Sequence, residues 1–153
     1  KTAKLFEAAA QLGAIVGGGS ILIEQGMATY GMHLGTAFQL VDDVLDYSGA
    51  EEETGKHLGD DLAEGKPTLP LIHVLQNGTP EQAACVRNAI ENGGREDFPR
   101  VLAAIRDTGA LEYAKQKAAQ EAERAAAALD TLPASQYKDS LLELSLFAVA
   151  RRY

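Results

Sequence analysis

Three aspartates are the residues in this sequence whose type and spacing best suit chemistry. Asp42, Asp43 and Asp46 stand within the apolar segment 38–47. On a helix, residues four apart share one face, so Asp42 and Asp46 should project together with Asp43 beside them. Like charges at this spacing destabilise a helix, and burying them without a partner costs more. Because Mg²⁺ binds through one or two carboxylates and the oxygens of a phosphorylated substrate, we predict that the cluster holds Mg²⁺ on a diphosphate.

A solvated acidic surface is the ordinary explanation of such a cluster. The chain has 22 Asp and Glu residues, and most acidic triplets in such a chain face water. A solvated face would place Lys, Glu or Ser around the aspartates. The flanking residues are instead apolar: Phe38, Leu40, Val41, Val44 and Leu45. This pattern predicts that the carboxylates lie on a helix that is mostly buried.

A glycine- and lysine-containing segment, 55–70, follows the acidic cluster. Lys56 and Lys66 each come directly after a glycine and could bring positive charge onto a phosphate. The glycines would let the backbone approach an anion and leave N–H groups free to bind it. We expect Pro67 to open a helix whose N-terminus faces the site and favours negative charge. A Gly-Lys pair alone usually marks a surface loop, but its place after the aspartates favours a phosphate-binding role.

The same segment carries a second acidic group, Asp60, Asp61 and Glu64. The glycines on either side make a long regular helix unfavourable here. We therefore predict Asp61 as a water-mediated metal ligand and Asp60 as a solvated residue. The segment is not a P-loop, because the pattern GxxxxGK[ST] is absent.

The overall composition indicates an ordinary globular protein. The length of 153 residues suits a single domain, and 46% of the residues are hydrophobic. A net charge of -8 argues against non-specific nucleic-acid binding but leaves room for a local basic pocket. The single Cys85 rules out an internal disulfide and fits a reducing cytosol, so we expect a cytoplasmic protein. The apolar run 13–23 contains four glycines and is too short to span a membrane.

Hydrophobic periodicity predicts an all-α fold without strands or repeats. The expected helices cover residues 3–13, 23–47, 67–76, 80–92, 97–108, 109–132 and 136–151. Ser20 should cap the second helix, and Thr79 with Gln82 has the pattern of a capping box. Gly31 and Gly35 are four apart within the second helix, which favours a close helix–helix contact over a break. The three histidines, His33, His57 and His73, have no partner at metal-ligand spacing and should be structural or exposed, and Tyr47 should pack with its hydroxyl at the rim.

These motifs together resemble those of trans-polyprenyl diphosphate synthases, most of all the bacterial octaprenyl type. The resemblance covers essentially the whole chain, with its motifs in the family's order: Lys1-Thr2-Ala3, residues 35–47, Gly55-Lys56 through Leu71, and residues 73–82. It implies a bundle of helices around a deep cavity, in which two aspartate-rich motifs hold Mg²⁺ on an allylic diphosphate. In that family the substrate ionises to an allylic carbocation, isopentenyl diphosphate adds to it, and a proton is lost.

The resemblance also implies roles for individual residues and partners. Four residues match positions at the metals: Asp42, Asp43 and Asp46 in the second aspartate-rich motif, and Asp61 near the third metal. Positions that contact the allylic diphosphate are matched by Lys1, Thr2, Gln39, Lys56 and Lys66, and we expect Lys1, Lys56 and Asp42 to be catalytic. The implied cofactor is Mg²⁺, and the implied substrates are an allylic diphosphate and isopentenyl diphosphate, with no nucleic-acid partner. A full-length homodimer, and an octaprenyl product that partitions to membranes and supplies quinone side chains, are further expectations.

The sequence departs from the family by lacking the first aspartate-rich motif and the Arg-Arg pair beside it. Arg151-Arg152 lies in the C-terminal tail and is no substitute, and the chain starts at Lys1 without an initiator Met. We therefore expect residues 1–153 to form the C-terminal half of a single all-α synthase domain. Several cations together stabilise a leaving diphosphate, so we expect this half to be inactive alone.

Two other functions remain open. The chain could be a non-catalytic subunit that pairs with an active synthase, or an all-α lyase of the terpene-cyclase type, which also uses Mg²⁺. The Lys1-Thr2 and Gly65-Lys66-Pro67 motifs favour the transferase over the lyase. An inactive subunit would usually have lost the aspartates, and here all three remain.

Overall fold

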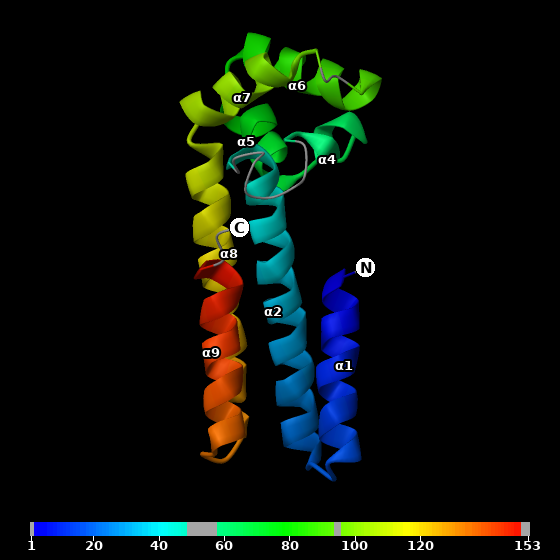
Figure 1. Cartoon of the computed structure of the whole chain (residues 1–153), viewed down its shortest axis with the longest axis vertical. Coiled ribbons are helices and arrows are strands. Elements are labelled where there is room, and N and C mark those ends of the chain that lie inside the picture. Colours follow the sequence, from blue (N-terminus) through cyan, green and yellow to red (C-terminus); the bar gives the residue numbers. More distant parts are fainter. Residues whose placement is uncertain (1, 49–57, 94–95, 151–153) are drawn as a thin grey trace. The chain divides into compact units, whose positions relative to one another are not determined.

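The computed structural model describes residues 2–48, 58–93 and 96–150, and these residues confirm the all-α prediction. Figure 1 shows the helices along the chain. They are α1 (Thr2–Val16), α2 (Ile21–Ser48), α4 (Asp60–Ala63), α5 (Leu69–Asn77), α6 (Pro80–Asn92), α7 (Phe98–Asp107), α8 (Ala110–Ala128), the 3-10 helix η1 (Leu129–Thr131) and α9 (Gln136–Ala150). None of these helices is long and apolar enough to cross a membrane.

The chain divides into two compact units, and the boundaries fall inside α2 and α8. Residues 1–41 and 117–152 form the first unit, and residues 42–116 form the second. The expectation of a single synthase domain over 1–153 stays a prediction.

In the first unit, α1 and α2 meet at the two glycines that the sequence singled out. A Cβ on Gly31 would collide with the backbone carbonyl of Phe6, and a Cβ on Gly35 would lie 2.7 Å from Cα of Ala3. The two helix backbones therefore touch where no side chain separates them, which confirms the predicted close contact. The rings of Phe6 and Phe38 pack beside this contact, with centroids 5.6 Å apart.

The start of α2 follows its predicted cap. The helix begins at Ile21, directly after Ser20, and the Ser20 hydroxyl accepts the backbone N–H of Ile23 at 3.4 Å. Ser20 thereby satisfies one of the N–H groups that the first turn leaves without a helical partner.

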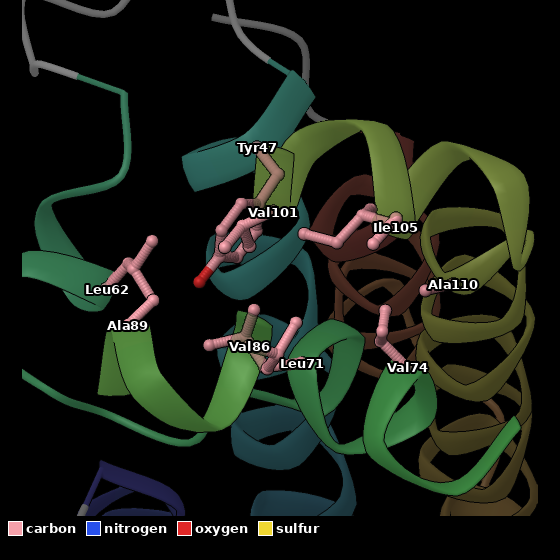
Figure 2. Close-up of a cluster of buried hydrophobic side chains, with 10 residues drawn as sticks. Tyr47, Leu62, Leu71, Val74, Val86, Ala89, Val101, Ile105 and Ala110 are labelled. Atoms are coloured by element: carbon pink, nitrogen blue, oxygen red, sulfur yellow. The ribbon is translucent and has the colours of Figure 1, made fainter. Parts of the chain in front are cut away.

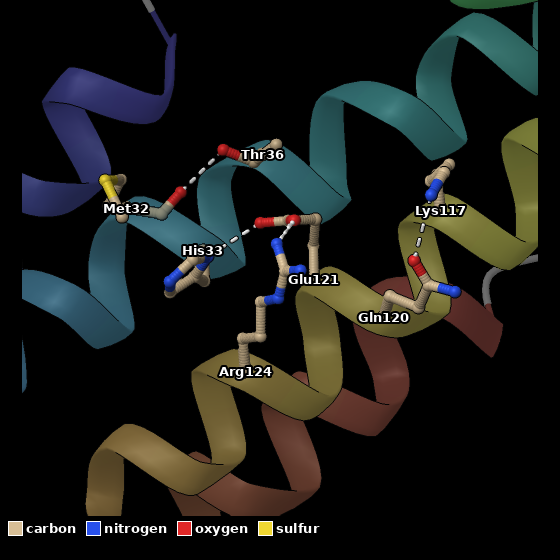
Figure 3. A network of polar contacts seen from close by, with 7 residues as sticks. All are labelled: Met32, His33, Thr36, Lys117, Gln120, Glu121 and Arg124. Atoms are coloured by element: carbon tan, nitrogen blue, oxygen red, sulfur yellow. Dashed lines mark hydrogen bonds and ion pairs between the residues drawn. The ribbon is translucent and has the colours of Figure 1, made fainter.

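A polar bridge joins α2 to α8 inside the first unit (Figure 3). Nδ1 of His33 lies 2.6 Å from Oε2 of Glu121, and Nη1 of Arg124 donates to the other oxygen of Glu121, also at 2.6 Å. The side chains of His33 and Glu121 are mostly buried. His33 is thus a structural residue, as expected from its sequence context.

The second unit has its own apolar core, built where α5, α6 and α7 pack together (Figure 2). Its buried members are Tyr47, Leu62, Leu71, Val74, Val86, Ala89, Val101, Ala104, Ile105 and Ala110. The predicted capping box at α6 is confirmed, because Thr79 Oγ1 accepts from Gln82 N and Gln82 Oε1 accepts from Thr79 N. His73 is structural too: its Nε2 lies 3.3 Å from the Thr108 carbonyl.

The predicted start of the next helix was wrong by two residues. Instead of opening at Pro67, α5 begins at Leu69, with Thr68 in the extended N-cap conformation and Pro70 in the first turn. Threonine is a preferred N-cap residue, and a proline costs no hydrogen bond in the first turn of a helix. Thr68-Leu69-Pro70 therefore starts the helix, and Pro67 lies in the turn before it.

Candidate functional site

The acidic cluster occupies the last two turns of α2. Asp42, Asp43 and Asp46 are partly buried, while the residues that alternate with them, Val41, Val44 and Tyr47, are buried. This confirms that the carboxylates lie on a largely buried helix end. Their neighbours in the second unit decide what each carboxylate can do.

Asp43 caps the N-terminus of α5. Its Oδ2 accepts the backbone N–H of Leu69 at 3.4 Å, whereas the side chain of Thr68 makes no cap bond. The negative charge of Asp43 thus lies at the positive end of the α5 dipole. The predicted meeting of a helix N-terminus with the aspartates is therefore present, although Pro67 does not begin that helix.

Tyr47 makes a second contact to the start of α5. Its hydroxyl lies 3.1 Å from Oγ1 of Thr68, in a buried hydrogen bond. Tyr47 is 2% exposed and Thr68 is 6% exposed. The prediction that Tyr47 packs is confirmed, but the prediction that its hydroxyl lies at the rim was wrong. The hydroxyl turns inward because a buried threonine offers it a partner.

Asp46 makes the corresponding contacts to α4. Its Oδ2 accepts the backbone N–H of Asp61 at 3.3 Å, and its carbonyl accepts the N–H of Gly59 at 3.0 Å. The short helix α4 is held by these bonds and by Leu62, which is fully buried. Asp46 therefore brings Asp61 to the end of α2, as the predicted metal site requires.

The two capping aspartates are in an environment that disfavours their charge. Burial raises the pKa of Asp43 to about 6; the Leu69 N–H lowers it in part, and the charge of Asp61 raises it further. Burial also raises the pKa of Asp46 to about 6, with the charge of Asp61 as the next cause. Carboxylates that are desolvated and close to like charges gain from a nearby cation. This part of the chain therefore has the electrostatics of a cation site.

Lys66 supplies a positive charge at this place. Its Nζ lies 2.8 Å from Oδ1 of Asp61 and 2.6 Å from Oε2 of Glu64. These hydrogen bonds raise the pKa of Lys66, so the ammonium stays charged. The side chain is half exposed and could reach an anion bound beside Asp61.

The two glycines of this segment that the structure describes, Gly59 and Gly65, serve packing and do not offer free N–H groups. The N–H of Gly59 bonds to the Asp46 carbonyl, and the N–H of Gly65 bonds to the Leu62 carbonyl. For these two glycines the predicted anion-binding role was wrong. Both have positive φ and lie against other groups, Gly59 against the Phe98 ring and Gly65 against the Ile90 carbonyl. A side chain at either position would be strained and would collide.

The structure gives less information on the remaining predicted site residues. Lys1 and Lys56 lie outside the described residues, together with His57 and the pair Arg151-Arg152. Thr2 begins α1 and is partly buried, and Gln39 is exposed on α2, one turn before Asp43. Both belong to the first unit, and their contacts with a diphosphate stay predictions.

The chemistry of the donor set suits Mg²⁺. Asp42, Asp43, Asp46 and Asp61 offer only hard oxygen donors, which this cation prefers. Within residues 2–48, 58–93 and 96–150, no three His, Cys, Asp or Glu side chains converge closely enough to hold a metal. Asp43 accepts the backbone N–H of Leu69, Asp46 accepts those of Asp61 and Asp60, and the oxygen lone pairs that remain are the candidate ligand sites. Which of the four aspartates bind metal stays a prediction.

The sequence motifs did not predict the contacts of Tyr47, Thr68 and the Leu69 N–H. Two signals could have revealed them. Tyr47 stands four residues after Asp43 and so shares its helix face. Thr68 precedes Leu69-Pro70, which is the pattern of an N-cap followed by a first-turn proline.

The fold is shared with solved polyprenyl synthases. The structure of a polyprenyl synthase from Caulobacter crescentus, complexed with calcium and isoprenyl diphosphate, matches with a TM-score of 0.91 and 42% identity over 100% of this chain and 47% of that one. A geranylgeranyl pyrophosphate synthase from Corynebacterium glutamicum, complexed with isoprenyl diphosphate and magnesium, matches with a TM-score of 0.80 and 36% identity over 92% of this chain and 41% of that one.

Sequence comparison assigns the chain to the same group. The chain belongs to the polyprenyl synthetase family, whose model matches residues 1–106. It is 52% identical to an octaprenyl diphosphate synthase from Haemophilus influenzae over 100% of this chain and 47% of that protein. The resemblance noted from the motifs is thereby confirmed. The chain spans about half the length of the curated relatives it matches.

Proposed function

We propose that the chain is the C-terminal part of a trans-polyprenyl diphosphate synthase, an enzyme that lengthens an allylic diphosphate with isopentenyl diphosphate. The family match and the order of the motifs support this class of reaction. The identity of 52% to an octaprenyl diphosphate synthase supports a long all-trans product, which we take to be octaprenyl diphosphate for quinone side chains.

The observation that carries the proposal is the meeting of carboxylates from two elements. Asp43 and Asp46 of α2 lie near enough to Asp61 of α4 for its charge to raise the pKa of both. A cation that neutralises these groups would also stabilise the negative charge of a departing diphosphate. The acidic helix end thus suits the ionisation of an allylic diphosphate.

The residues of this chain have distinct parts in that chemistry. Asp42, Asp43, Asp46 and Asp61 would hold Mg²⁺ through their oxygens. Cationic and polar side chains would bind the diphosphate and balance the charge that develops when it leaves: Lys1, Thr2, Gln39, Lys56 and Lys66. Lys66 is supported most directly, because its ammonium already lies beside Asp61.

The proposal is tested by determining the coding sequence upstream of Lys1 and assaying the encoded protein. We expect an in-frame aspartate-rich motif followed by Arg-Arg. The full-length protein should then incorporate labelled isopentenyl diphosphate into an octaprenyl product in the presence of Mg²⁺, and the D42N variant should lose most of this activity. A stop codon or an unrelated domain upstream would contradict the proposal and favour a non-catalytic partner subunit.

A further inference from the structure

We infer that Tyr47 and Thr68 are positioning residues, whose buried hydrogen bond holds segment 59–69 at the end of α2 and thereby places Asp61 and Lys66. This inference deepens the proposed function and rests on it for the role of those two side chains. Neither Tyr47 nor Thr68 would touch a substrate or a metal in this arrangement. They would act by placing Asp61 and Lys66, the side chains that would touch a metal or substrate.

Segment 59–69 is attached to α2 at both of its ends. At its start, the N–H groups of Gly59 and Asp61 bond to the carbonyl and carboxylate of Asp46. At its end, the Leu69 N–H bonds to Asp43, and Thr68 bonds to Tyr47. The side chains of Asp61 and Lys66 lie between these two attachments.

The hydrogen bonds that attach the segment differ in how they respond to a cation. Those from the N–H groups of Asp60, Asp61 and Leu69 use the carboxylate oxygens of Asp46 and Asp43, for which a bound cation would compete. The hydrogen bond between Tyr47 and Thr68 joins two neutral hydroxyl groups, and both residues are almost completely buried. It therefore keeps its strength whether the carboxylates face N–H groups or a metal, and it can hold the segment while the ligands change.

Tyr47 is itself held firmly. Its ring belongs to the buried core of the second unit (Figure 2), and it stacks on Phe98 with ring centroids 6.4 Å apart and planes 18° from parallel. A hydroxyl on a ring that is fixed in a packed core has little freedom, so it defines one position for its partner Thr68.

A short and rigid connection carries the position of Thr68 to the charged side chains. The Thr68 N–H bonds to the Lys66 carbonyl at 3.0 Å, and the Lys66 N–H bonds to the Asp61 carbonyl at 2.9 Å. The residue between Lys66 and Thr68 is Pro67, whose ring fixes its φ angle. A displacement of Thr68 would therefore move Lys66, and with it the ion pair to Asp61.

The test compares Y47F with a matched control, Y30F. Tyr30 is also 2% exposed, and its hydroxyl is also hydrogen-bonded, to the Leu141 carbonyl and to the Ser145 side chain in the first unit. Both variants lose one buried hydroxyl, but only Y47F releases Thr68. T68V and the double variant Y47F/T68V complete a double-mutant cycle on the same bond.

The first readout is amide hydrogen exchange of residues 59–69 on chain 1–153. We expect Y47F and T68V to raise exchange at Asp61 and Leu69 by about five-fold or more, with Y30F close to wild type there. The double variant should exchange no faster than the faster single variant, because both remove the same bond. Equal exchange of this segment in Y47F and Y30F, or additive effects in the double variant, would overturn the inference.

The second readout is the binding of inorganic diphosphate in the presence of Mg²⁺. We expect Y47F to weaken binding about three-fold to ten-fold and Y30F to leave it unchanged. If the wild-type chain binds diphosphate and Y47F binds it equally well, the positioning role is overturned. If the wild-type chain binds no diphosphate while Y47F still loosens the segment, the proposed diphosphate site on this chain fails and the anchoring of segment 59–69 stands.

Discussion

Asp43 and Asp46 lie in positions where the charge of their carboxylates lowers the stability of the fold. Burial raises the pKa of both carboxyl groups to about 6, so each is held ionised at neutral pH at a cost to folding. The backbone N–H groups of Leu69 and Asp61 offset part of that cost. A bound cation would offset more, which links the stability of this region to metal binding.

Neutralising either carboxylate should therefore stabilise the metal-free chain. We expect D43N and D46N each to raise the free energy of unfolding by about 1 kcal/mol at pH 7 in EDTA, after allowing for partial exposure. The asparagine amide oxygen can still accept the backbone N–H. Urea unfolding at fixed ionic strength measures the change.

The pH dependence of stability in the same two variants tests the direction of the pKa shift. The folded-state pKa values of about 6 lie above the ordinary aspartate value, so the folded chain binds protons more tightly than the unfolded chain. The contribution of these groups to stability must then rise as pH falls from about 7 towards 4. D43N and D46N should each lack only the share of this rise that comes from the replaced aspartate, so the advantage of each variant over the wild-type chain should disappear at acidic pH. Loss of stability in both variants at pH 7 would contradict the account.

Lys66 should matter for anion binding and not for folding. Its ion pairs with Asp61 and Glu64 are exposed, and such pairs contribute little to stability. K66M should therefore keep the wild-type urea midpoint but weaken Mg²⁺-dependent diphosphate binding by about ten-fold, as measured by calorimetry. The control is K4M, which removes another exposed lysine, paired 2.7 Å from Glu7, far from the acidic cluster in sequence. Equal weakening of diphosphate binding in both variants would indicate that binding depends on the overall charge of the chain and not on a specific site.

At the scale of helices, short sequence patterns predicted the features that depend on contacts between residues close in sequence, such as helix caps. Ser20, and Thr79 with Gln82, were recognisable as caps because the whole capping interaction lies within four residues. The helix carrying the aspartates could be predicted because its apolar residues recur with the helical period. The N-cap role of Thr68 was missed because two prolines compete nearby, and Pro67 looked like the first helical residue.

Contacts between segments could not be predicted in the same way. The bonds from Asp43 to Leu69 and from Tyr47 to Thr68 join residues 26 and 21 positions apart. Their existence depends on how α5 packs beside α2, which no short pattern encodes. The sequence therefore named candidate site residues, whose roles stay predictions, but it could not predict the contacts that anchor them.

The contact between α1 and α2 provides a test at this scale. G31A or G35A should destabilise the chain by about 1–3 kcal/mol, because the added methyl group collides with the backbone of α1. G13A is the matched control, since Gly13 is a helical glycine with nothing within 4 Å of its Cβ position. That change should stabilise the chain by about 0.5–1 kcal/mol through helix propensity. Chemical denaturation distinguishes the two, and stabilisation by G31A would refute the close contact.

At the scale of the whole molecule, the first unit exposes many large apolar side chains. Those on α1, at the start of α2 and on α9 include Leu5, Leu12, Val16, Ile21, Leu146 and Phe147, each more than half exposed. A groove of about 390 Å³, lined by residues of these same three helices, adds to this surface. A monomeric protein in water rarely exposes so much apolar surface.

The chain on its own should therefore bind hydrophobic dyes. We expect L12E to lower the fluorescence of bound ANS without loss of stability, because Leu12 is 58% exposed. L34E should instead unfold the chain, since Leu34 is 4% exposed and the new charge would have no partner. ANS titration with circular dichroism separates these outcomes. A folded L34E, or an unfolded L12E, would show that the faces of the first unit are assigned wrongly.

The most direct test of the central claim is calorimetric titration of chain 1–153 with inorganic diphosphate, in Mg²⁺ and in EDTA. The proposed site at the end of α2 predicts binding in Mg²⁺ that disappears in EDTA and in the D42N variant. Binding that is the same in EDTA, or unchanged in D42N, would show that the diphosphate binds elsewhere. Absence of binding in Mg²⁺ would contradict a metal and diphosphate site in this part of the chain.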